Sequence, residues 1–223
     1  MKRTCFVTAA GTDIGKTYVL CRILEQLRAG GERVSAVKPV SSGFEMSMCV
    51  ESDAGRIIAA LGKEVDREGI MRIAPWRFRD AVSPDIAARR EGQTVELAQV
   101  AAFCRESGPD QGRFHFIEGA GGVLSPLGQE FTNLDLIAAL NCRSILVTGG
   151  YLGAISHSLT AVAAMRARNC VPVAIVLSGA LDGPVSLQET GATISRFESP
   201  PVFIVDRDAT VPEDLLQLLK LTA

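Results

Sequence analysis

Short apolar runs alternate with longer amphipathic segments along nearly all of this chain. Several runs are apolar at almost every position, which is typical of strands that are covered on both faces. Strands that alternate with helices form a parallel sheet with helices on both of its faces, so the pattern predicts an α/β fold. The expected strands are residues 4–8, 33–37, 114–118, 144–148, 171–177 and 202–205, and the expected helices are 16–29, 53–61, 95–106, 133–140, 156–168, 185–195 and 212–221.

The domain organisation follows from the length of the chain and from the uniformity of its sequence. The chain has 223 residues and shows no internal repeat, low-complexity segment or linker. Such a length suits one domain and can bury a substantial core. We therefore expect a single domain over residues 1–223, with two loops, 39–52 and 119–131, that are long enough to carry function.

Charge and cysteine usage exclude several classes of protein. The net charge is −2 with no basic cluster, which predicts that nucleic acid is not a partner. No apolar run approaches the ~20 residues of a membrane helix, so we expect no membrane span. The six cysteines are scattered singly without a C-x-x-C pair. They are typical of reduced thiols in a cytoplasmic protein, and neither a zinc site nor a disulfide framework is expected.

The segment A-A-G-T-D-I-G-K-T, residues 9–17, lies between the first expected strand and the first expected helix. In that context backbone N–H groups at the helix start converge on phosphate oxygens. Lys16 would bridge the β- and γ-phosphates of a nucleotide, and the Thr17 hydroxyl would bind Mg²⁺. The alternative is a glycine-rich turn with an exposed lysine. The flanking strand and helix favour phosphate binding.

One position departs from the G-x-x-x-x-G-K-[ST] pattern of such loops. Its first glycine is replaced by Ala10, and Gly11 follows one residue later. We expect Gly11 to supply the backbone freedom that the loop needs in place of that glycine.

Carboxylates for a nucleotide-bound Mg²⁺ are expected at the ends of parallel strands, beside the phosphates. Glu118 ends a buried strand and is followed by four small residues, 119–122, whose backbone another molecule can approach closely. Asp53 opens a helix. From the residues alone, Asp53 is equally consistent with a metal ligand and with a helix N-cap, a role that Ser52 could also fill.

Lys38 is a second candidate cation. It ends the strand at residues 33–37 and is followed by Pro39. At that edge of the sheet it could neutralise a phosphoryl group in transfer, or a carboxylate that accepts it. The alternative is a lysine that simply faces solvent. Its place at a strand end favours a functional role.

Taken together, these motifs resemble those of the dethiobiotin synthetase family. The resemblance covers most of the chain, and the ordered set is far more specific than the phosphate loop alone. The matching motifs are Thr12-x-x-Gly15-Lys16-Thr17, Lys38-Pro39-Val40-x-Ser42-Gly43, Ser52-Asp53-Ala54, Ser83-Pro84, Glu118-Gly119-Ala120-Gly121-Gly122, Ser125-Pro126-Leu127 and Leu152-Gly153-x-Ile155-x-His157.

The resemblance implies a reaction of 7,8-diaminononanoate with CO₂ and ATP. In the family an amine takes up CO₂ as a carbamate, ATP phosphorylates the carbamate, and the second amine closes a cyclic urea and expels phosphate. Lys16 and Lys38 would then be the catalytic cations. The resemblance also favours Asp53 as a ligand of Mg²⁺, together with Thr17 and Glu118.

The remaining site residues are also implied by the resemblance. The diamine and the carbamate would be bound by Ser42, Lys38 and Gly122. The carboxylate tail of the diamine would reach a helix N-terminus of a partner subunit, at Gly153, Ala154, Ile155 and Ser156. That arrangement implies a homodimer. The residues expected to bind the nucleotide are Thr12, Asp13, Ile14, Gly15, Lys16, Thr17, Asp53, Glu118, Gly119, Ala120, Gly121, Ser178, Gly179, Val205 and Asp206.

Two departures from the family pattern bear on nucleotide binding. The leading Gly-Thr-Asp of the family loop is replaced by residues 9–11, which predicts an altered loop conformation with phosphate binding retained. The family's Asn-Asp, which reads adenine, is replaced by Ser178-Gly179. A hydroxyl cannot form the paired hydrogen bonds of an amide, so we expect a loosened preference for ATP over other nucleoside triphosphates.

Two other classes of function are weighed against the ligase. A partitioning-type switch ATPase usually carries an extra lysine in the loop, where this chain has Gly11. A non-catalytic nucleotide-binding relative would be consistent with the Ser178 change, although both lysines and both carboxylates are present. A switch GTPase is disfavoured because no N-K-x-D motif occurs.

Overall fold

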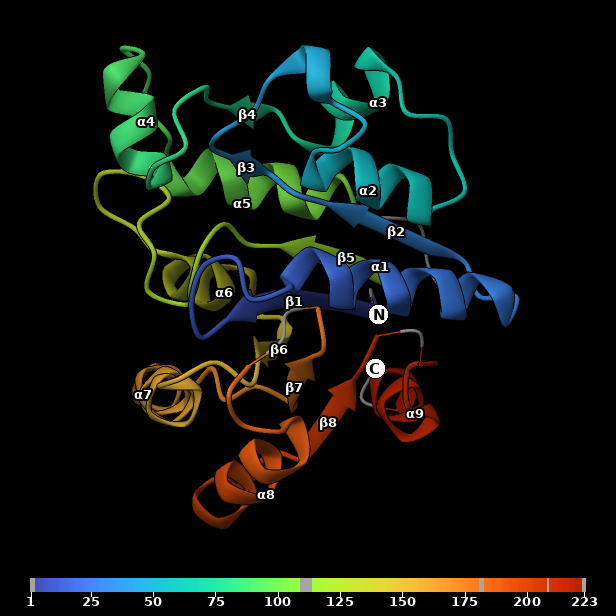
Figure 1. Ribbon diagram of the computed structural model, residues 1–223. Helices are drawn as coiled ribbons and strands as arrows, with labels where there is room; N and C mark the ends of the chain where they lie inside the picture. The colour runs from blue at the N-terminus through green and yellow to red at the C-terminus, as the bar shows by residue number, and fades with distance from the viewer. Residues whose placement is uncertain (1–2, 109–113, 181–182, 208, 222–223) are drawn as a thin grey trace.

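The computed structural model describes residues 3–108, 114–180, 183–207 and 209–221. Within them, six parallel strands form one sheet in the order β2-β5-β1-β6-β7-β8 (Figure 1). This confirms the α/β class. The strands are β1 (Arg3–Ala9), β2 (Val34–Val37), β5 (Phe114–Glu118), β6 (Arg143–Thr148), β7 (Ala174–Ser178) and β8 (Val202–Val205).

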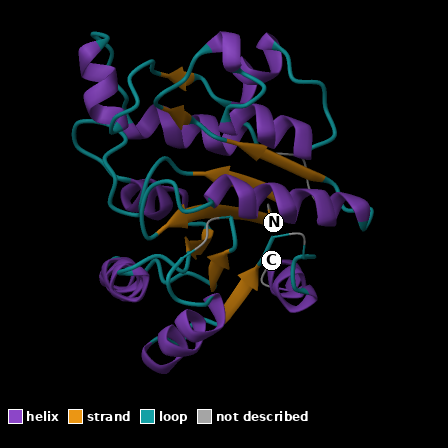
Figure 2. Cartoon of the chain, viewed as in Figure 1, coloured by secondary structure: helices purple, strands orange, loops and turns teal. Residues whose placement is uncertain are grey.

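Helices cover both faces of this sheet (Figure 2). In Figure 1, α7 and α9 lie on opposite sides of β6, β7 and β8. Gln26 of α1 bonds the Val211 backbone just before α9, at 3.1 and 2.8 Å. On the other face, Arg166 of α7 forms an ion pair with Glu198 after α8. The helices are α1 (Lys16–Ala29), α2 (Asp53–Ala60), α5 (Leu97–Glu106), α6 (Asn133–Leu140), α7 (Ala154–Ala167), α8 (Leu187–Phe197) and α9 (Glu213–Leu221).

The central strands are buried along their whole length, as their continuous apolar sequence predicts. Every residue of β5 and of β7 is buried. The parallel register pairs Val7 of β1 with Glu118 and Ala9 with Val147. This register brings the C-terminal ends of β1, β5 and β6 to one edge of the sheet, where the loops that follow them meet.

A second, smaller unit was not predicted from the sequence. Strands β3 (Val40–Ser41) and β4 (Trp76–Arg77) pair in parallel, in a region that also contains a 3₁₀ turn (Met46–Met48), α3 (Arg67–Ile73) and α4 (Pro84–Arg90). These elements are too short to show a clear hydrophobic period. The unit places β3 and the 3₁₀ turn within residues 39–52, which were expected to form a long loop.

Element boundaries differ from the sequence prediction by a few residues at several ends. The strand predicted at residues 171–177 is observed as β7, three residues later at its start. Pro172 has no N–H to donate to a ladder, and the first ladder-like bond is Val173 N to Ser144 O at 2.8 Å. The helix predicted to begin at residue 156 begins at Ala154.

All six cysteines are free, and burial raises the pKa of the Cys5 and Cys104 thiols to about 12, so neither is a reactive thiolate near neutral pH. In the described residues, no helix combines the length and the apolar character that crossing a bilayer requires.

Candidate active site

The loop at residues 10–17 connects β1 to α1 and turns on two residues with left-handed backbone. Asp13 has φ 55° and Gly15 has φ 91°. A Cβ on Gly15 would lie 2.1 Å from Ser178 Oγ, so glycine is required there on steric as well as conformational grounds. Gly11 does not adopt a positive φ, so our expectation that it supplies the loop's backbone freedom was wrong.

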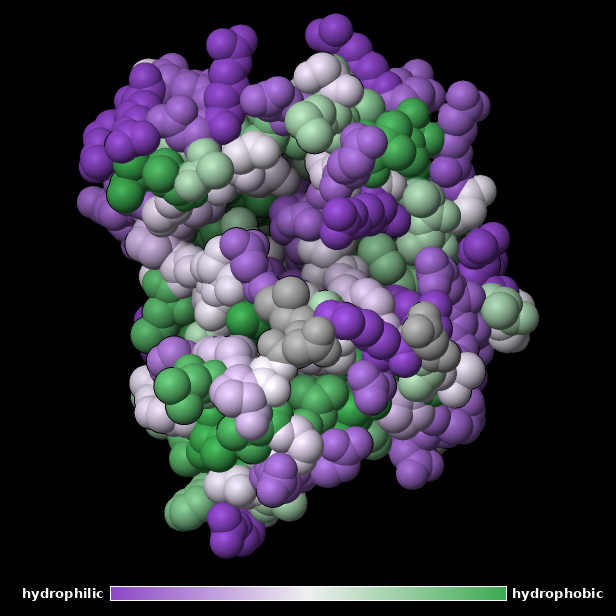
Figure 3. Space-filling model, in the orientation of Figure 1, coloured by the Kyte–Doolittle hydropathy of each residue, from purple (hydrophilic) through white to green (hydrophobic). Residues whose placement is uncertain are grey.

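The N-terminus of α1 opens into a cleft of about 370 Å³. The surface is hollowed near the middle of the view in Figure 3, with hydrophilic residues beside the hollow. Lys16 and Thr17, the first residues of α1, are both largely buried at its floor. The described residues that line it are Thr12, Asp13, Ile14, Gly15, Lys16, Thr17, Tyr18, Lys38, Ser41, Ser42, Asp53, Arg56, Ala120, Gly121 and Ala180.

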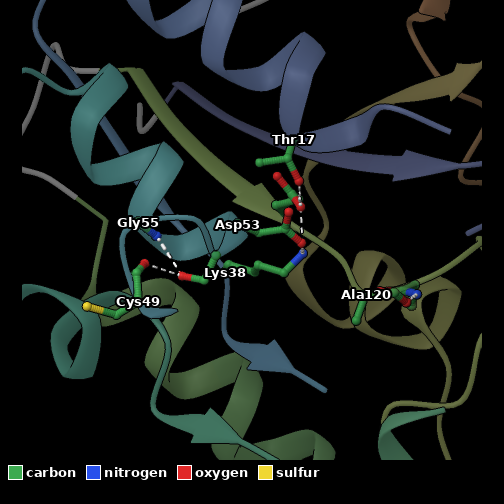
Figure 4. Close-up of polar contacts among 9 residues, drawn as sticks. Thr17, Lys38, Cys49, Asp53, Gly55 and Ala120 are labelled. Carbon is green, nitrogen blue, oxygen red and sulfur yellow. Dashed lines mark hydrogen bonds and ion pairs between the residues drawn. The ribbon is translucent and has the colours of Figure 1, made fainter. Parts of the chain in front are cut away.

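Lys38 lies between two carboxylates on this side of the cleft (Figure 4). Its Nζ is 2.6 Å from Glu118 Oε1 and 2.8 Å from Asp53 Oδ2. The Thr17 hydroxyl donates to the same Glu118 Oε1 at 2.8 Å. One polar cluster therefore joins four predicted residues that are distant in the sequence: one directly after β2, one at the end of β5, and one each from α1 and α2.

The structure shows which residue is the N-cap of α2. Ser52 is the N-cap, and its hydroxyl accepts from Gly55 N at 3.1 Å. Asp53 is the first residue of the helix, and its carboxylate contacts Lys38. A Cβ on Gly55 would lie 2.1 Å from Cys49 O, so the small residue allows α2 to pack where Asp53 reaches the cluster.

The charges of the cluster shift one another's pKa values. Burial disfavours the charged form of Lys38, but Glu118 and Asp53 outweigh it, and the pKa of Lys38 is raised. For Asp53, burial is outweighed by Lys38, and its pKa is lowered. Burial and the nearby Lys38 ammonium lower the pKa of Lys16 to about 8, so near neutral pH the cluster holds two ammonium groups and ionised carboxylate.

The surroundings of the Glu118 carboxylate indicate whether the cluster suits a divalent cation. Its Oε2 is fully buried and accepts no hydrogen bond from any described residue, which is costly for a carboxylate oxygen. A cation would supply the missing partner. In the described residues, His, Cys, Asp and Glu form no group of three or more that could bind a metal by themselves. A hydroxyl and two carboxylates suit Mg²⁺, whose coordination shell is usually completed by phosphates and water.

The glycine-rich loop after Glu118 is held by a residue that the sequence analysis treated only as a helix start. Asn133, fully buried in the first turn of α6, donates through Nδ2 to Ala120 O at 2.7 Å and to Gly122 O at 2.8 Å. A Cβ on Gly119 would lie 2.3 Å from Asn133 Oδ1. The local signal available was a polar residue that begins an otherwise apolar helix.

The predicted diamine-binding residues fall into three places. Ser42 lines the cleft together with Lys38. Gly122 lies outside that lining, and its N–H donates to Ser125 Oγ at 2.7 Å. The segment Gly153 to Ser156 forms the N-terminus of α7 and lines a separate, largely apolar hollow of about 550 Å³. Within one chain, the structure does not bring this segment to the cleft.

The predicted base-binding residues meet at the ends of β7 and β8. Gly179 N donates to Val205 O at 2.8 Å. Ser178 is 2% exposed and Val205 is 0% exposed, so both are packed beneath the surface, whereas Asp206 is exposed. The ends of β7 and β8 are therefore adjacent. Of the residues predicted here to bind the base, only Asp206 is exposed.

Four residues that line the cleft were missed: Tyr18, Ser41, Arg56 and Ala180. Arg56 lies three residues after Asp53 on α2, a spacing that places two side chains on one helix face. That spacing was the signal available for it. Ser41 immediately precedes the predicted Ser42, and Tyr18 follows the predicted Thr17.

Comparison with known proteins places this site in a family. Residues 3–212 match the model of a family described as an AAA domain. The ATP-dependent dethiobiotin synthetase of Acidiphilium cryptum strain JF-5 is 41% identical, with 90% of this chain and 92% of that protein covered. The same enzyme of Caulobacter vibrioides strain NA1000 is 46% identical, with 88% of each covered. This chain belongs to the ATP-dependent dethiobiotin synthetase family.

Solved structures of other proteins share the fold. The MinC:MinD cell division complex of Aquifex aeolicus aligns with a TM-score of 0.54 at 9% identity, over 97% of this chain and 84% of that chain. A ParA family ATPase of Chlorobium tepidum TLS gives 0.52 at 15% identity, over 98% and 88%. At such low identity these likenesses show the fold alone. Membership of the dethiobiotin synthetase family confirms the resemblance drawn from the motifs.

Proposed function

We propose that this chain closes the ureido ring of dethiobiotin from 7,8-diaminononanoate and CO₂, with conversion of ATP to ADP and phosphate. One amine and CO₂ form a carbamate with loss of a proton. The carbamate oxygen attacks the γ-phosphorus, the bond to ADP breaks, and a carbamic–phosphoric mixed anhydride results. The second amine attacks the carbonyl carbon and loses a proton, and the C–O bond to phosphate breaks as the cyclic urea forms.

The cluster on Lys38 supports this proposal because two anions must meet in the phosphoryl transfer. Lys16, at the N-terminus of α1, and Lys38, at the end of β2, both line the cleft. Their ammonium groups offset the charge that develops where carbamate and γ-phosphate meet. The N–H groups at the start of α1 hold the phosphates against the same cations.

Thr17, Asp53 and Glu118 would hold the Mg²⁺ of the nucleotide. The unpartnered Glu118 Oε2 and the all-oxygen character of the three groups support this assignment. When bound, Mg²⁺ neutralises charge on the β- and γ-phosphate oxygens. The chain's own contribution is to orient the oxygen ligands: Thr17 donates to Glu118, and Lys38 contacts both carboxylates.

Positioning of the diamine accounts for the rest of the site. Ser42 lines the same cleft as the phosphate loop, where it can orient the amines so that ring closure becomes effectively unimolecular. Because the N-terminus of α7 lines a different hollow, we propose that a second copy of the chain provides it. The carboxylate tail would then bind at Gly153 to Ser156 of that copy, in a homodimer with composite sites.

The same proposal sets the cellular context. We propose that the chain acts as one domain, in the cytoplasm, on small molecules. Neither nucleic acid nor a membrane is required by any step. The free cysteines and the net charge of −2 support this assignment.

The ion-pair cluster of Lys38 with Asp53 and Glu118 is the observation that carries the proposal. Its test is phosphate release from ATP by the purified protein, with and without diaminononanoate and bicarbonate. We expect release that depends on both, with dethiobiotin formed in equal amount. Release that ignores the diamine would instead indicate a switch ATPase, and binding without release would indicate a non-catalytic nucleotide-binding relative.

A further inference from the structure

The positively charged residues of the cleft differ in how they are held. Its described lining contains Lys16, Lys38 and Arg56. Lys38 is paired with two carboxylates, whereas the side chains of Lys16 and Arg56 make no hydrogen bond or ion pair with any residue that the structure describes. The proposed function gives Lys16 the phosphates of the nucleotide as its ligand. It gives Arg56 none.

The start of α2 determines where Arg56 lies. The Ser52 hydroxyl donates to Cys49 O at 2.6 Å and accepts from Gly55 N at 3.1 Å. A Cβ on Gly55 would lie 2.1 Å from Cys49 O, so the helix packs closely on the segment that precedes it. Arg56 is three residues after Asp53, a spacing that places both side chains on one face of the helix. The packing that brings Asp53 to the polar cluster therefore also brings Arg56 to the cleft.

Asp53 is the acidic residue on this face of α2, but its carboxylate is engaged elsewhere. Its Oδ2 lies 2.8 Å from Lys38 Nζ, and Figure 4 shows the two side chains pointing toward one another. Arg56 is exposed, and a guanidinium keeps its proton throughout the physiological pH range. The cleft therefore carries a permanent positive charge that is not paired with any described carboxylate.

Arg56 lies on the side of the cleft that α1 forms. Burial raises the pKa of the Cys21 thiol to about 12, and the charge of Arg56 opposes that rise. Cys21 is one helical turn after Thr17 on α1. Because the interaction between two charges weakens with distance, this effect indicates that the guanidinium is close to the first two turns of α1, where the phosphate loop ends.

The diamine would bind on a different side. A second hollow of about 330 Å³ adjoins the cleft. Both are lined by Thr12, Asp13, Ser42, Ala120 and Gly121. Arg56 and Tyr18 line the cleft but not the second hollow. Since Ser42 is the residue proposed to orient the diamine, Arg56 adjoins the nucleotide rather than the diamine.

We propose that Arg56 is a further phosphate-binding residue of this site, and that its guanidinium donates to a non-bridging oxygen of the nucleotide's phosphates. This inference rests on the nucleotide site of the proposed function and adds a residue to it. A nucleoside triphosphate carries more negative charge than one Mg²⁺ neutralises, and a guanidinium forms strong charge-assisted hydrogen bonds with phosphate. Lys38 cannot fully supply that charge, because its ammonium group is shared by two carboxylates.

The test measures equilibrium binding by calorimetry in the presence of Mg²⁺. The ligands are ATP and inorganic tripolyphosphate, which has phosphates but no base. Arg56→Gln removes the charge and keeps a polar side chain. We expect it to weaken both ligands by about tenfold, the size of one charge-assisted hydrogen bond, because the lost contact is to a group that they share. Arg56→Lys keeps a charged donor, so it should weaken them by only about threefold.

Steady-state kinetics locate the contact within the site. In Arg56→Gln the KM for ATP should rise, while the KM for diaminononanoate stays unchanged. Arg89→Gln is the matched control, because Arg89 is also exposed, makes no hydrogen bond or ion pair within the described part of the chain, and does not line the cleft. It should bind both ligands normally. Thermal unfolding checks that all three variants are folded.

Three results would overturn the inference: wild-type affinity for both ligands in Arg56→Gln, a loss of affinity confined to ATP, or a higher KM for the diamine without any loss of nucleotide affinity. The second would indicate a contact to the nucleoside, and the third a contact to the diamine. Failure of the proposed function is recognised separately, by phosphate release from the wild-type protein that ignores the diamine. An Arg56 variant that binds as the wild type does would remove Arg56 and leave the proposed function standing.

Discussion

At the scale of single residues, the site depends on how Lys38 is held. A buried lysine tends to lose its proton, yet Lys38 contacts two carboxylates at 2.6 and 2.8 Å, and these raise its pKa. The side chain therefore remains an ammonium group where carbamate and phosphate would meet. Lys16 lacks such close anionic partners in the described contacts, and its pKa is lowered instead.

Replacement of Lys38 by glutamine should abolish ring formation while nucleotide binding remains largely intact. The change removes the cation beside the transferring phosphoryl group but leaves the phosphate loop in place. We expect a fall in kcat of at least about a hundredfold, comparable to the loss of one electrostatic group in a preorganised site. Dethiobiotin formation and ATP calorimetry measure the two effects. The control is Lys63→Gln, an exposed lysine; normal turnover in Lys38→Gln would exclude Lys38 from the mechanism.

Asn133 is a second residue whose effect can be measured. Asn133→Ala removes two buried hydrogen bonds to the backbone at Ala120 and Gly122 and leaves both carbonyls without that partner. We expect a loss of about 2 kcal/mol in the free energy of unfolding, together with a higher KM for the diamine because the loop is less ordered. Urea unfolding and steady-state kinetics test this. Gln93→Ala, at an exposed position, should change neither; an unchanged unfolding midpoint in Asn133→Ala would contradict the role assigned to the side chain.

At the scale of elements, α6 shows how a local sequence signal secures a distant loop. Thr132 and Asp135 form the capping box that their spacing predicts. The Asp135 carboxylate accepts from Thr132 N at 2.9 Å and from the Thr132 hydroxyl at 2.8 Å. Asn133 directly follows Thr132. The cap therefore also fixes the helical turn from which the Asn133 side chain holds the glycine-rich loop.

The cap should give a measurable pH dependence of stability. Burial disfavours the charged form of Asp135, but the Thr132 hydrogen bonds and Arg168 together outweigh it, and the pKa of Asp135 is lowered. A lowered carboxyl pKa stabilises the fold above the ordinary pKa of ~4 and loses that contribution as the pH falls through the folded value. Asp135→Asn should therefore cost about 0.5–1 kcal/mol near neutral pH, and the difference from wild type should shrink in acid. Urea unfolding across this range measures it; a difference that is constant with pH would refute the assignment to charge.

At the scale of the whole molecule, the separation of the cleft from the N-terminus of α7 has the largest consequence. The two hollows share no described lining residue. Leu152, beside that N-terminus, is 85% exposed, and Leu124 is 53% exposed. In the proposed dimer, leucines exposed beside the tail-binding segment would be covered by the second copy.

Mixed dimers test whether the sites are composite. Ser156→Asp suits the first turn of a helix but repels an anionic tail, so it should raise the KM for the diamine. Lys38→Gln inactivates the other half of the site. A dimer of the two variants contains one fully intact site, and equal mixing with subunit exchange should restore about a quarter of wild-type activity at low diamine concentration. Ser156→Ala is the matched control, and mixing that restores nothing would contradict the composite arrangement.

The order of strands and helices, the phosphate loop and the family motifs could all be read from the sequence. These features depend on periodicity and on local spacing, because side chains two or about 3.6 residues apart share a face of a strand or a helix. Local spacing also predicts the cap at Thr132. It likewise identifies four candidate site residues: Lys16, Lys38, Asp53 and Glu118. The short elements β3, β4, α3 and α4 escaped prediction because they lack enough residues to show a period.

Tertiary structure alone decided which of these side chains meet. The sequence left Asp53 as either a cap or a ligand, and only the packing of α2 against α1 directs its carboxylate to Lys38. The fold also packs the Ser178 hydroxyl against Gly15 of the phosphate loop, a contact that the sequence did not indicate. The reason is that contacts between parallel strands join residues separated by an entire helix, so no local pattern records them.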